Sequence, residues 1–134
     1  MKKKYVLDTS VYLTYASHNK LYRLLDIAKR YDLIFYASEH LIAEIFKNAA
    51  RVIKTPTLSP EDVLKSIRKL ADIVNTIPDF NRSPDPKDNF LFDLAIQTGS
   101  EIIVTKETAL LNFADSPVAI HDIKWFKETF PVPL

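Results

Sequence analysis

The chain contains no cysteine and only one glycine, and these two absences exclude several classes of protein. Without cysteine there can be no disulfide, thiolate metal site, cysteine nucleophile or thiol redox chemistry. Phosphate-binding loops of the Walker A and dinucleotide types need several glycines in a fixed pattern. Because Gly99 is the single glycine, the sequence argues against a nucleotide-cofactor enzyme of those types.

Long apolar runs and several catalytic motifs are missing as well. No segment is long enough to span a bilayer, and the residues before Asp8 are too few for a signal peptide's apolar region. We therefore expect a cytoplasmic protein without a membrane partner. No Gly-x-Ser-x-Gly motif presents a serine nucleophile, and the histidines lack the spacing of zinc ligands: His18, His40 and His121. A net charge of +1 neither indicates nor excludes a nucleic-acid partner.

What the chain does contain is an alternation of short apolar runs with helical patterns. Its 134 residues suit one domain, spanning 1–134. The patterns predict strands over Tyr5–Leu7, Leu33–Ala37, Ile102–Thr105 and Val118–Ile120. They predict helices over Ser10–Ala16, Leu21–Tyr31, Ser38–Lys54 (closed by Pro56), Ser59–Asn75 (ended by Pro78), Asp85–Gly99 and Asp122–Thr129. Strands separated by helices imply a parallel sheet, and so an α/β protein with three α/β/α layers.

Two acidic residues stand at or just past the carboxyl ends of predicted strands. Asp8 comes after Tyr5–Leu7, and Glu107 stands just past Ile102–Thr105. In open α/β sheets this carboxyl edge is where ligands bind. A carboxylate there needs a donor or a cation, although Asp8 could equally serve only as the cap of the next helix. If the two strands are neighbours, both carboxylates face the same edge.

Three further acids have patterns that favour structural roles. On a helical wheel Glu44 falls opposite the apolar arc of its helix, which indicates a solvent-exposed acid with basic neighbours. Asp88 is the third residue of its helix if Asp85 is the cap, so it could complete a capping box and interact with the helix dipole. Asp93 lies five positions further on and is expected at the surface.

The ordered set of these segments resembles the PIN-domain ribonucleases. The segments are Val6-Leu7-Asp8-Thr9-Ser10-Val11, an acid in the second main helix, Asp85-Pro86-Lys87-Asp88-Asn89-Phe90-Leu91 with Leu94-Ala95, and Ile103-Val104-Thr105 with Leu110-Leu111. The likeness runs from about residue 4 to about residue 128 and is greatest to the toxin nucleases of prokaryotic toxin–antitoxin pairs. It implies a PIN-like fold with a parallel sheet of four or five strands and acids at its carboxyl edge.

The resemblance also implies an activity and partners. It implies an endoribonuclease that hydrolyses RNA phosphodiester bonds with Mg²⁺ or Mn²⁺ and is held in check by an antitoxin protein; a homodimer is left open. On this mapping Asp8, Glu44, Asp88 and Glu107 match the family's four acidic metal-binding and catalytic positions. Ser10 matches a small polar position that supports the site. Asp8 would be the central ligand and Asp88 its neighbour, with Glu44 and Glu107 as outer ligands or water-orienting groups.

The fourth acidic position departs from the family's pattern, which often reads Val-Thr-Gly-Asp-x-Asp-Leu-Leu. Here Lys106 replaces the glycine, Glu107 the first acid and Ala109 the second. The alternative is therefore a PIN-fold module that binds RNA or protein with weak or no nuclease activity. A third interpretation is a phosphoacceptor or phosphatase domain that uses Asp8. Phosphatases of the haloacid-dehalogenase type have a second aspartate two residues after the first, and Ser10 at that position argues against this interpretation.

Overall fold

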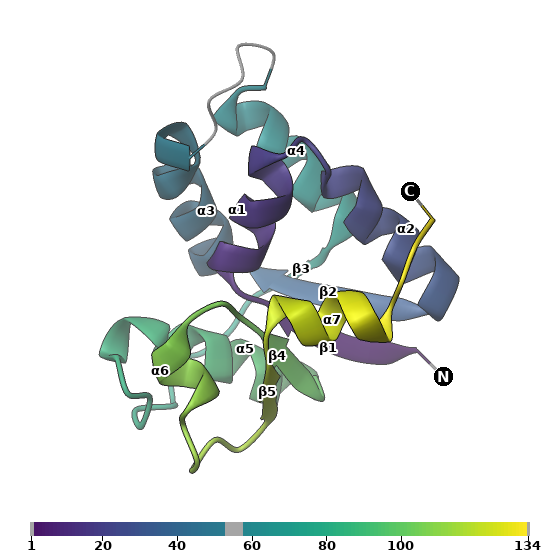
Figure 1. Cartoon of the computed structure of the whole chain (residues 1–134). Coiled ribbons are helices and arrows are strands. Elements are labelled where there is room, and N and C mark those ends of the chain that lie inside the picture. The colour runs from purple at the N-terminus through teal and green to yellow at the C-terminus, as the bar shows by residue number, and fades with distance from the viewer. Residues whose placement is uncertain (1, 53–57, 134) are drawn as a thin grey trace.

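The computed structural model describes residues 2–52 and 58–133, which form a parallel sheet between layers of helices (Figure 1). The strands are β1 (Lys3–Leu7), β2 (Leu33–Ser38), β3 (Asp72–Val74), β4 (Ile102–Val104) and β5 (Ala119–His121). They lie in the order β3-β2-β1-β4-β5, and each neighbouring pair is parallel. The prediction of a three-layer α/β/α fold with a parallel sheet is confirmed.

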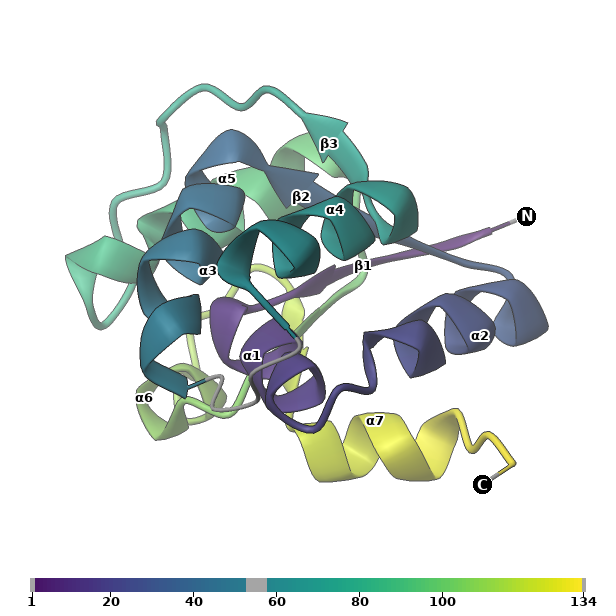
Figure 2. The same ribbon diagram turned by 90° about the horizontal axis from the view of Figure 1, so that it is seen from above.

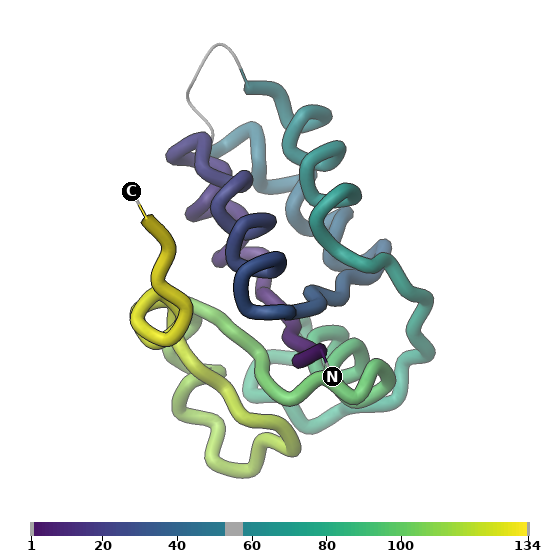
Figure 3. The backbone as a smooth tube through the Cα atoms, turned by 90° about the vertical axis from the view of Figure 1, so that its right-hand side faces the viewer, coloured from purple at the N-terminus to yellow at the C-terminus, as the bar shows by residue number. Residues whose placement is uncertain are grey.

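Two groups of helices cover the two faces of this sheet. The helices are α1 (Thr9–Ser17), α2 (Leu21–Tyr31), α3 (Glu39–Val52), α4 (Pro60–Leu70), α5 (Asn89–Thr98), α6 (Thr108–Leu111) and α7 (Ile123–Thr129), with a 3₁₀ helix, η1 (Pro86–Asp88), before α5. Helices α1 to α4 lie on one face and α5 on the other, as the end-on view in Figure 3 shows. Helix α7 runs alongside α1 and α2 (Figure 2).

Local sequence signals account for several helix ends. The Ser59 hydroxyl accepts the Asp62 N–H at 3.2 Å, and the Asp62 carboxylate accepts the Ser59 N–H at 3.2 Å, which completes a capping box at α4. Ser38 caps α3 through the Leu41 N–H. Gly99 ends α5 in the left-handed region with φ of +69°, where a residue without Cβ is least strained.

The predicted helix over Ser59–Asn75 is wrong at its carboxyl end. Helix α4 stops at Leu70, and Asp72–Val74 becomes edge strand β3, which pairs with Tyr36–Ser38 of β2. The β-branched Ile73 and Val74 favour an extended backbone, and the free edge of β2 offers hydrogen-bonding partners that the helical pattern does not reveal. The predicted helix end at Lys54 and the closing Pro56 lie outside the described residues.

The expectation that Asp93 lies at the surface is also wrong. Its side chain is 5% exposed, and its Oδ1 accepts N–H bonds from Asp79 at 3.1 Å and Phe80 at 2.8 Å. These bonds attach the segment after β3 to α5. The partners come from a loop that the helical wheel of α5 cannot include, so the periodicity gave no sign of them.

We expect Asp93→Ala to lower the free energy of unfolding by about 1–3 kcal/mol, because two partly buried N–H groups lose their acceptor. Urea denaturation followed by circular dichroism measures this. Asp115→Ala, which removes an exposed acid, is the matched control and should change stability by less than about 0.5 kcal/mol. Equal stability of the two variants would contradict the anchoring role of Asp93.

Candidate metal centre

The register of the two central strands brings the predicted acids to one edge. Leu7 of β1 is the partner of Val104 of β4, and the Asp8 N–H donates to the Val104 carbonyl at 2.9 Å. The direction of strand order reverses between β1 and β4, so their carboxyl ends form the topological switch point at which α/β proteins bind ligands. The condition set by the sequence is therefore met: the strands that Asp8 and Glu107 follow are neighbours in the sheet.

The Asp8 carboxylate is buried and held by three donors. Its Oδ1 accepts the Thr9 N–H at 2.7 Å, and its Oδ2 accepts the hydroxyls of Thr105 at 2.7 Å and Ser10 at 3.2 Å. Burial to 6% exposure raises the pKa of Asp8, and these hydrogen bonds oppose that rise. Asp8 is also the N-cap of α1, so the capping interpretation is correct without excluding a ligand role.

The turn after β4 is attached to Asp8 through Thr105 and Ser10. The Glu107 N–H donates to the Thr105 hydroxyl at 3.0 Å, and the Lys106 N–H donates to the Ser10 hydroxyl at 3.1 Å. Thr105 is fully buried. Sequence reasoning treated it as the end of a strand and missed its contact with Asp8; the pairing of the two strands was the signal that could have found it.

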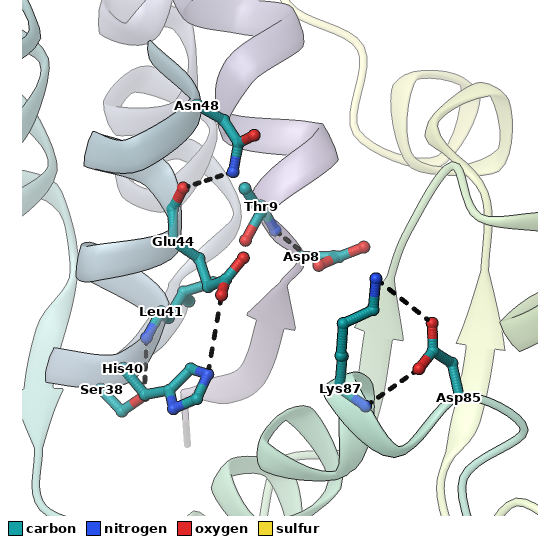
Figure 4. Close-up of polar contacts among 9 residues, drawn as sticks. All are labelled: Asp8, Thr9, Ser38, His40, Leu41, Glu44, Asn48, Asp85 and Lys87. Carbon is teal, nitrogen blue, oxygen red and sulfur yellow. Dashed lines mark hydrogen bonds and ion pairs between the residues drawn. The ribbon is translucent and has the colours of Figure 1, made fainter.

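Three carboxylates converge beside Asp8. One oxygen from each of Asp85, Asp88 and Glu107 lies within 4.8 Å of the others. Asp85 caps η1 by accepting the Lys87 N–H at 3.0 Å, and its other oxygen is 3.8 Å from Lys87 Nζ (Figure 4). Its capping role was predicted from the sequence, whereas its place in the carboxylate group was not.

Asp88 is the acid whose surroundings most clearly favour a bound cation. Burial raises its pKa to about 7, and the nearby carboxylates of Glu107, Asp8 and Asp85 contribute to the rise. Its Oδ2 is buried and has no hydrogen-bond partner among the described residues. A divalent cation of the Mg²⁺ or Mn²⁺ type prefers carboxylate oxygens and would relieve both the repulsion and the missing contact. The residues therefore fit a bound metal ion.

Glu44, the remaining predicted acid, lies on helix α3 and lines one cavity together with the other acids. In Figure 4 its carboxylate lies on the side of α3 that faces Asp8. It is 4.0 Å from His40 Nε2, and its side chain is 41% exposed. The cavity of about 390 Å³ is lined by all four predicted acids and by Ser10: Asp8, Ser10, Glu44, Asp88 and Glu107. Of the predicted acids, Asp88 and Glu107 belong to the group of three converging carboxylates, whereas Glu44 and Asp8 stand outside it.

A family model described as a PIN domain matches residues 4–109, which is more than half of the chain. The chain belongs to the PIN-domain family. The PIN-domain match ends at Ala109, so it includes every acid that lines the cavity. A comparison with curated proteins gives no match. Within the described residues, no helix of this PIN domain has the length and apolar character that crossing a membrane requires.

Solved structures share the PIN fold at low sequence identity. PAE2754 from Pyrobaculum aerophilum superposes with a TM-score of 0.61 and 19% identity, over 96% of this chain and 89% of that one. VapBC2 from Rickettsia felis, bound to a DNA fragment from their promoter, gives a TM-score of 0.59 and 14% identity, over 89% of this chain and 98% of that one. At these identities the likeness establishes the fold.

We expect the melting temperature of the metal-free protein to fall as pH rises from about 4 to about 7. Folded Asp88 keeps its proton up to about pH 7, whereas the unfolded residue loses it near 3.8. The native state therefore binds more protons in this window, and the free energy of unfolding decreases with pH. Thermal denaturation in a chelator measures this slope. Asp88→Asn should flatten it and Asp115→Asn should not; identical slopes in all three proteins would contradict the assignment.

Proposed function

We propose that this PIN-domain protein is a metal-dependent endoribonuclease that hydrolyses RNA phosphodiester bonds. The observation that carries the proposal is the convergence of the Asp85, Asp88 and Glu107 carboxylates beside buried Asp8 at the switch point of the sheet. Such a donor set suits Mg²⁺ or Mn²⁺. Metal-dependent hydrolysis of this kind does not need histidine or cysteine ligands.

Some of the acids would bind the metal ion, and another would orient a water molecule. Asp8, Asp88 and Glu107 would hold the ion, and Glu44, across the cavity, would orient a water molecule from the opposite side. A bound divalent ion supplies a water of lowered pKa and neutralises charge on the phosphate. Thr105 and Ser10 fix the Asp8 carboxylate in one orientation, so it does not have to be ordered when the metal binds.

The rim of the cavity carries groups suited to a polyanion. Arg51, Lys87 and Asn48 line it together with the acids. The Lys87 side chain is 87% exposed and Arg51 is exposed, so both are accessible to a phosphate group. An acidic floor with a basic rim fits a negatively charged strand whose scissile phosphate meets the carboxylates through a cation.

We further propose that the enzyme is the toxin of a toxin–antitoxin pair acting in the cytoplasm, where RNA is available. The order of its acids resembles the toxin nucleases, and its fold is similar to that of VapBC2. An antitoxin that covers the cavity would then control access to the acids. Co-purification with the product of an adjacent short reading frame, and loss of RNA cleavage in that complex, would test this part.

The second candidate is a PIN-fold module that binds RNA or protein without cutting it. Ala109 favours it, because this exposed residue places no carboxylate where the family pattern has its last acid. The two candidates differ in their response to metal. A nuclease should cleave single-stranded RNA in proportion to bound Mn²⁺, whereas a binding module should bind RNA equally well in a chelator.

We expect Asp8→Asn to abolish RNA cleavage while the fold is retained. The asparagine carbonyl can still accept a hydrogen bond from the Thr9 N–H. The hydroxyls of Thr105 and Ser10 can rotate to accept hydrogen bonds from the asparagine NH₂ group. Cleavage of labelled single-stranded RNA in Mn²⁺, together with melting curves, measures both effects. Saturating Mn²⁺ at 100 times its Kd should stabilise the parent by about 2.7 kcal/mol and the variant much less. Equal cleavage by variant and parent would refute the assignment.

We expect Glu107→Ala to weaken Mn²⁺ binding at least ~10-fold and Glu44→Gln to weaken it less. Glu107 belongs to the converging group, whereas Glu44 stands apart from it. Isothermal titration calorimetry of the metal-free proteins gives both affinities. The double substitution Glu107→Asp with Ala109→Asp should strengthen Mn²⁺ binding. The first change leaves one fewer rotatable bond to be ordered, and the second adds a carboxylate. A larger loss in Glu44→Gln than in Glu107→Ala would reverse our ranking.

A further inference from the structure

A second cavity lies away from the acids, where α1, α2 and α7 meet (Figure 2). Its volume is about 410 Å³, within the range of small-molecule pockets. Four basic residues line it, and none of its lining residues is acidic: His18, Lys20, Arg23 and Lys127. Within the described part of the chain, Lys20, Arg23 and Lys127 form no ion pair. The cavity thus gathers positive charge that the fold does not neutralise.

The walls of this basic cavity are built from packed aromatic residues. Tyr15 and Phe130 are each 6% exposed. Lys127 Nζ lies 5.7 Å from the centre of the Tyr15 ring, and the Phe130 ring packs on Tyr31 with centroids 5.1 Å apart. The Tyr31 hydroxyl donates to the Pro131 carbonyl, which holds the chain end that forms one side of the cavity. The basic side chains therefore lie beside packed aromatic rings.

A continuous path of hydrogen bonds joins this cavity to the acidic site. Lys106 donates from its backbone to the Ser10 hydroxyl and from Nζ to the Thr14 hydroxyl at 3.2 Å. Thr14 lies one helical turn beyond Ser10, donates to its carbonyl at 2.8 Å, and lines the basic cavity. A strand leaving the acids along α1 would meet Lys106 first and the basic cavity next.

We propose that the basic cavity between α1, α2 and α7 is a phosphate-binding subsite for the RNA strand beyond the point of cleavage. This inference rests on the proposed nuclease function. The planar guanidinium of Arg23 suits paired hydrogen bonds to phosphate oxygens, and the ammonium groups of Lys20 and Lys127 supply point charges. Such contacts position a strand without reading its sequence. Lys106, in the place of the family's glycine, bridges the two sites.

Binding of single-stranded RNA to the full chain tests this subsite. All proteins carry Asp8→Asn so that the RNA is not cut, and fluorescence anisotropy gives the Kd over a range of salt. The first variant adds Arg23→Gln and Lys127→Gln. The second replaces exposed residues only, Lys20→Gln and Lys127→Gln, which avoids any folding defect at half-buried Arg23. The control, Lys65→Gln with Lys69→Gln, removes the same charge from the exposed face of α4.

We expect both cavity variants to bind RNA at least ~10-fold more weakly, with the slope of log K against log salt reduced by about 1.4 for two lost phosphate contacts. The α4 control should keep the parent slope. Equal losses in control and cavity variants, or an unchanged slope, would overturn the proposal. A third outcome would also overturn it: inorganic phosphate or polyglutamate binds the cavity, but the cavity substitutions leave RNA binding unchanged. The cavity would then bind a free anion or an acidic protein.

Cleavage assays with an intact Asp8 separate this inference from the proposed function. In Mn²⁺ the cavity variants should show a raised KM for long RNA, with kcat and the cleavage of a dinucleotide unchanged. If the parent cleaves but the cavity variants match it on long RNA, the subsite is wrong and the nuclease stands. If the parent cleaves nothing, the nuclease assignment fails, while the anisotropy measurements still decide whether the cavity binds RNA.

Discussion

The buried carboxylate of Asp8 is the constraint on which the rest of the site depends. A negative charge with 6% exposure is tolerated because three donors from two segments surround it: Thr9, Ser10 and Thr105. The Ser10 and Thr105 hydroxyls also accept the Lys106 and Glu107 N–H groups, which fixes the turn that carries Glu107. The hydroxyls of Ser10 and Thr105 thus have two roles: they donate to the buried Asp8 carboxylate, and they accept the N–H groups that set the position of Glu107.

Charge is distributed unevenly around α1, and this organises the surface. At its amino end Asp8 caps the helix, beside Asp88, whose pKa is raised to about 7 by burial and by the neighbouring carboxylates. Past its carboxyl end lie Lys20 and Arg23, which share a cavity with Lys127. A polyanion would meet repulsion at one end, unless a cation is bound there, and attraction at the other. Metal loading and strand binding are therefore expected to reinforce each other.

The sequence predicted what depends on local pattern and missed what depends on tertiary pairing. The central strands, the Ser59 cap and the Gly99 stop follow from residues close in sequence, and the ordered acids identified the fold. Strand β3 was missed because its partner, β2, lies more than thirty residues earlier. Thr105 and Asp85 were missed as site residues, and Asp93 was misplaced, because each contact depends on a segment that periodicity cannot bring near. Glu44 faces the cavity even though its helical wheel indicated solvent, since a cleft is also solvent-exposed.

Both edge strands of the sheet are short. The outer Asp72–Val74 and Ala119–His121 contain three residues, as does the inner β4, whereas the inner β1 and β2 contain five and six. A three-residue edge offers few unpaired backbone groups to another chain, and Asp72 places a charge at the start of one of them. The long, apolar strands that would promote intermolecular association are enclosed by these short ones. The arrangement should keep newly made copies from joining edge to edge at high concentration.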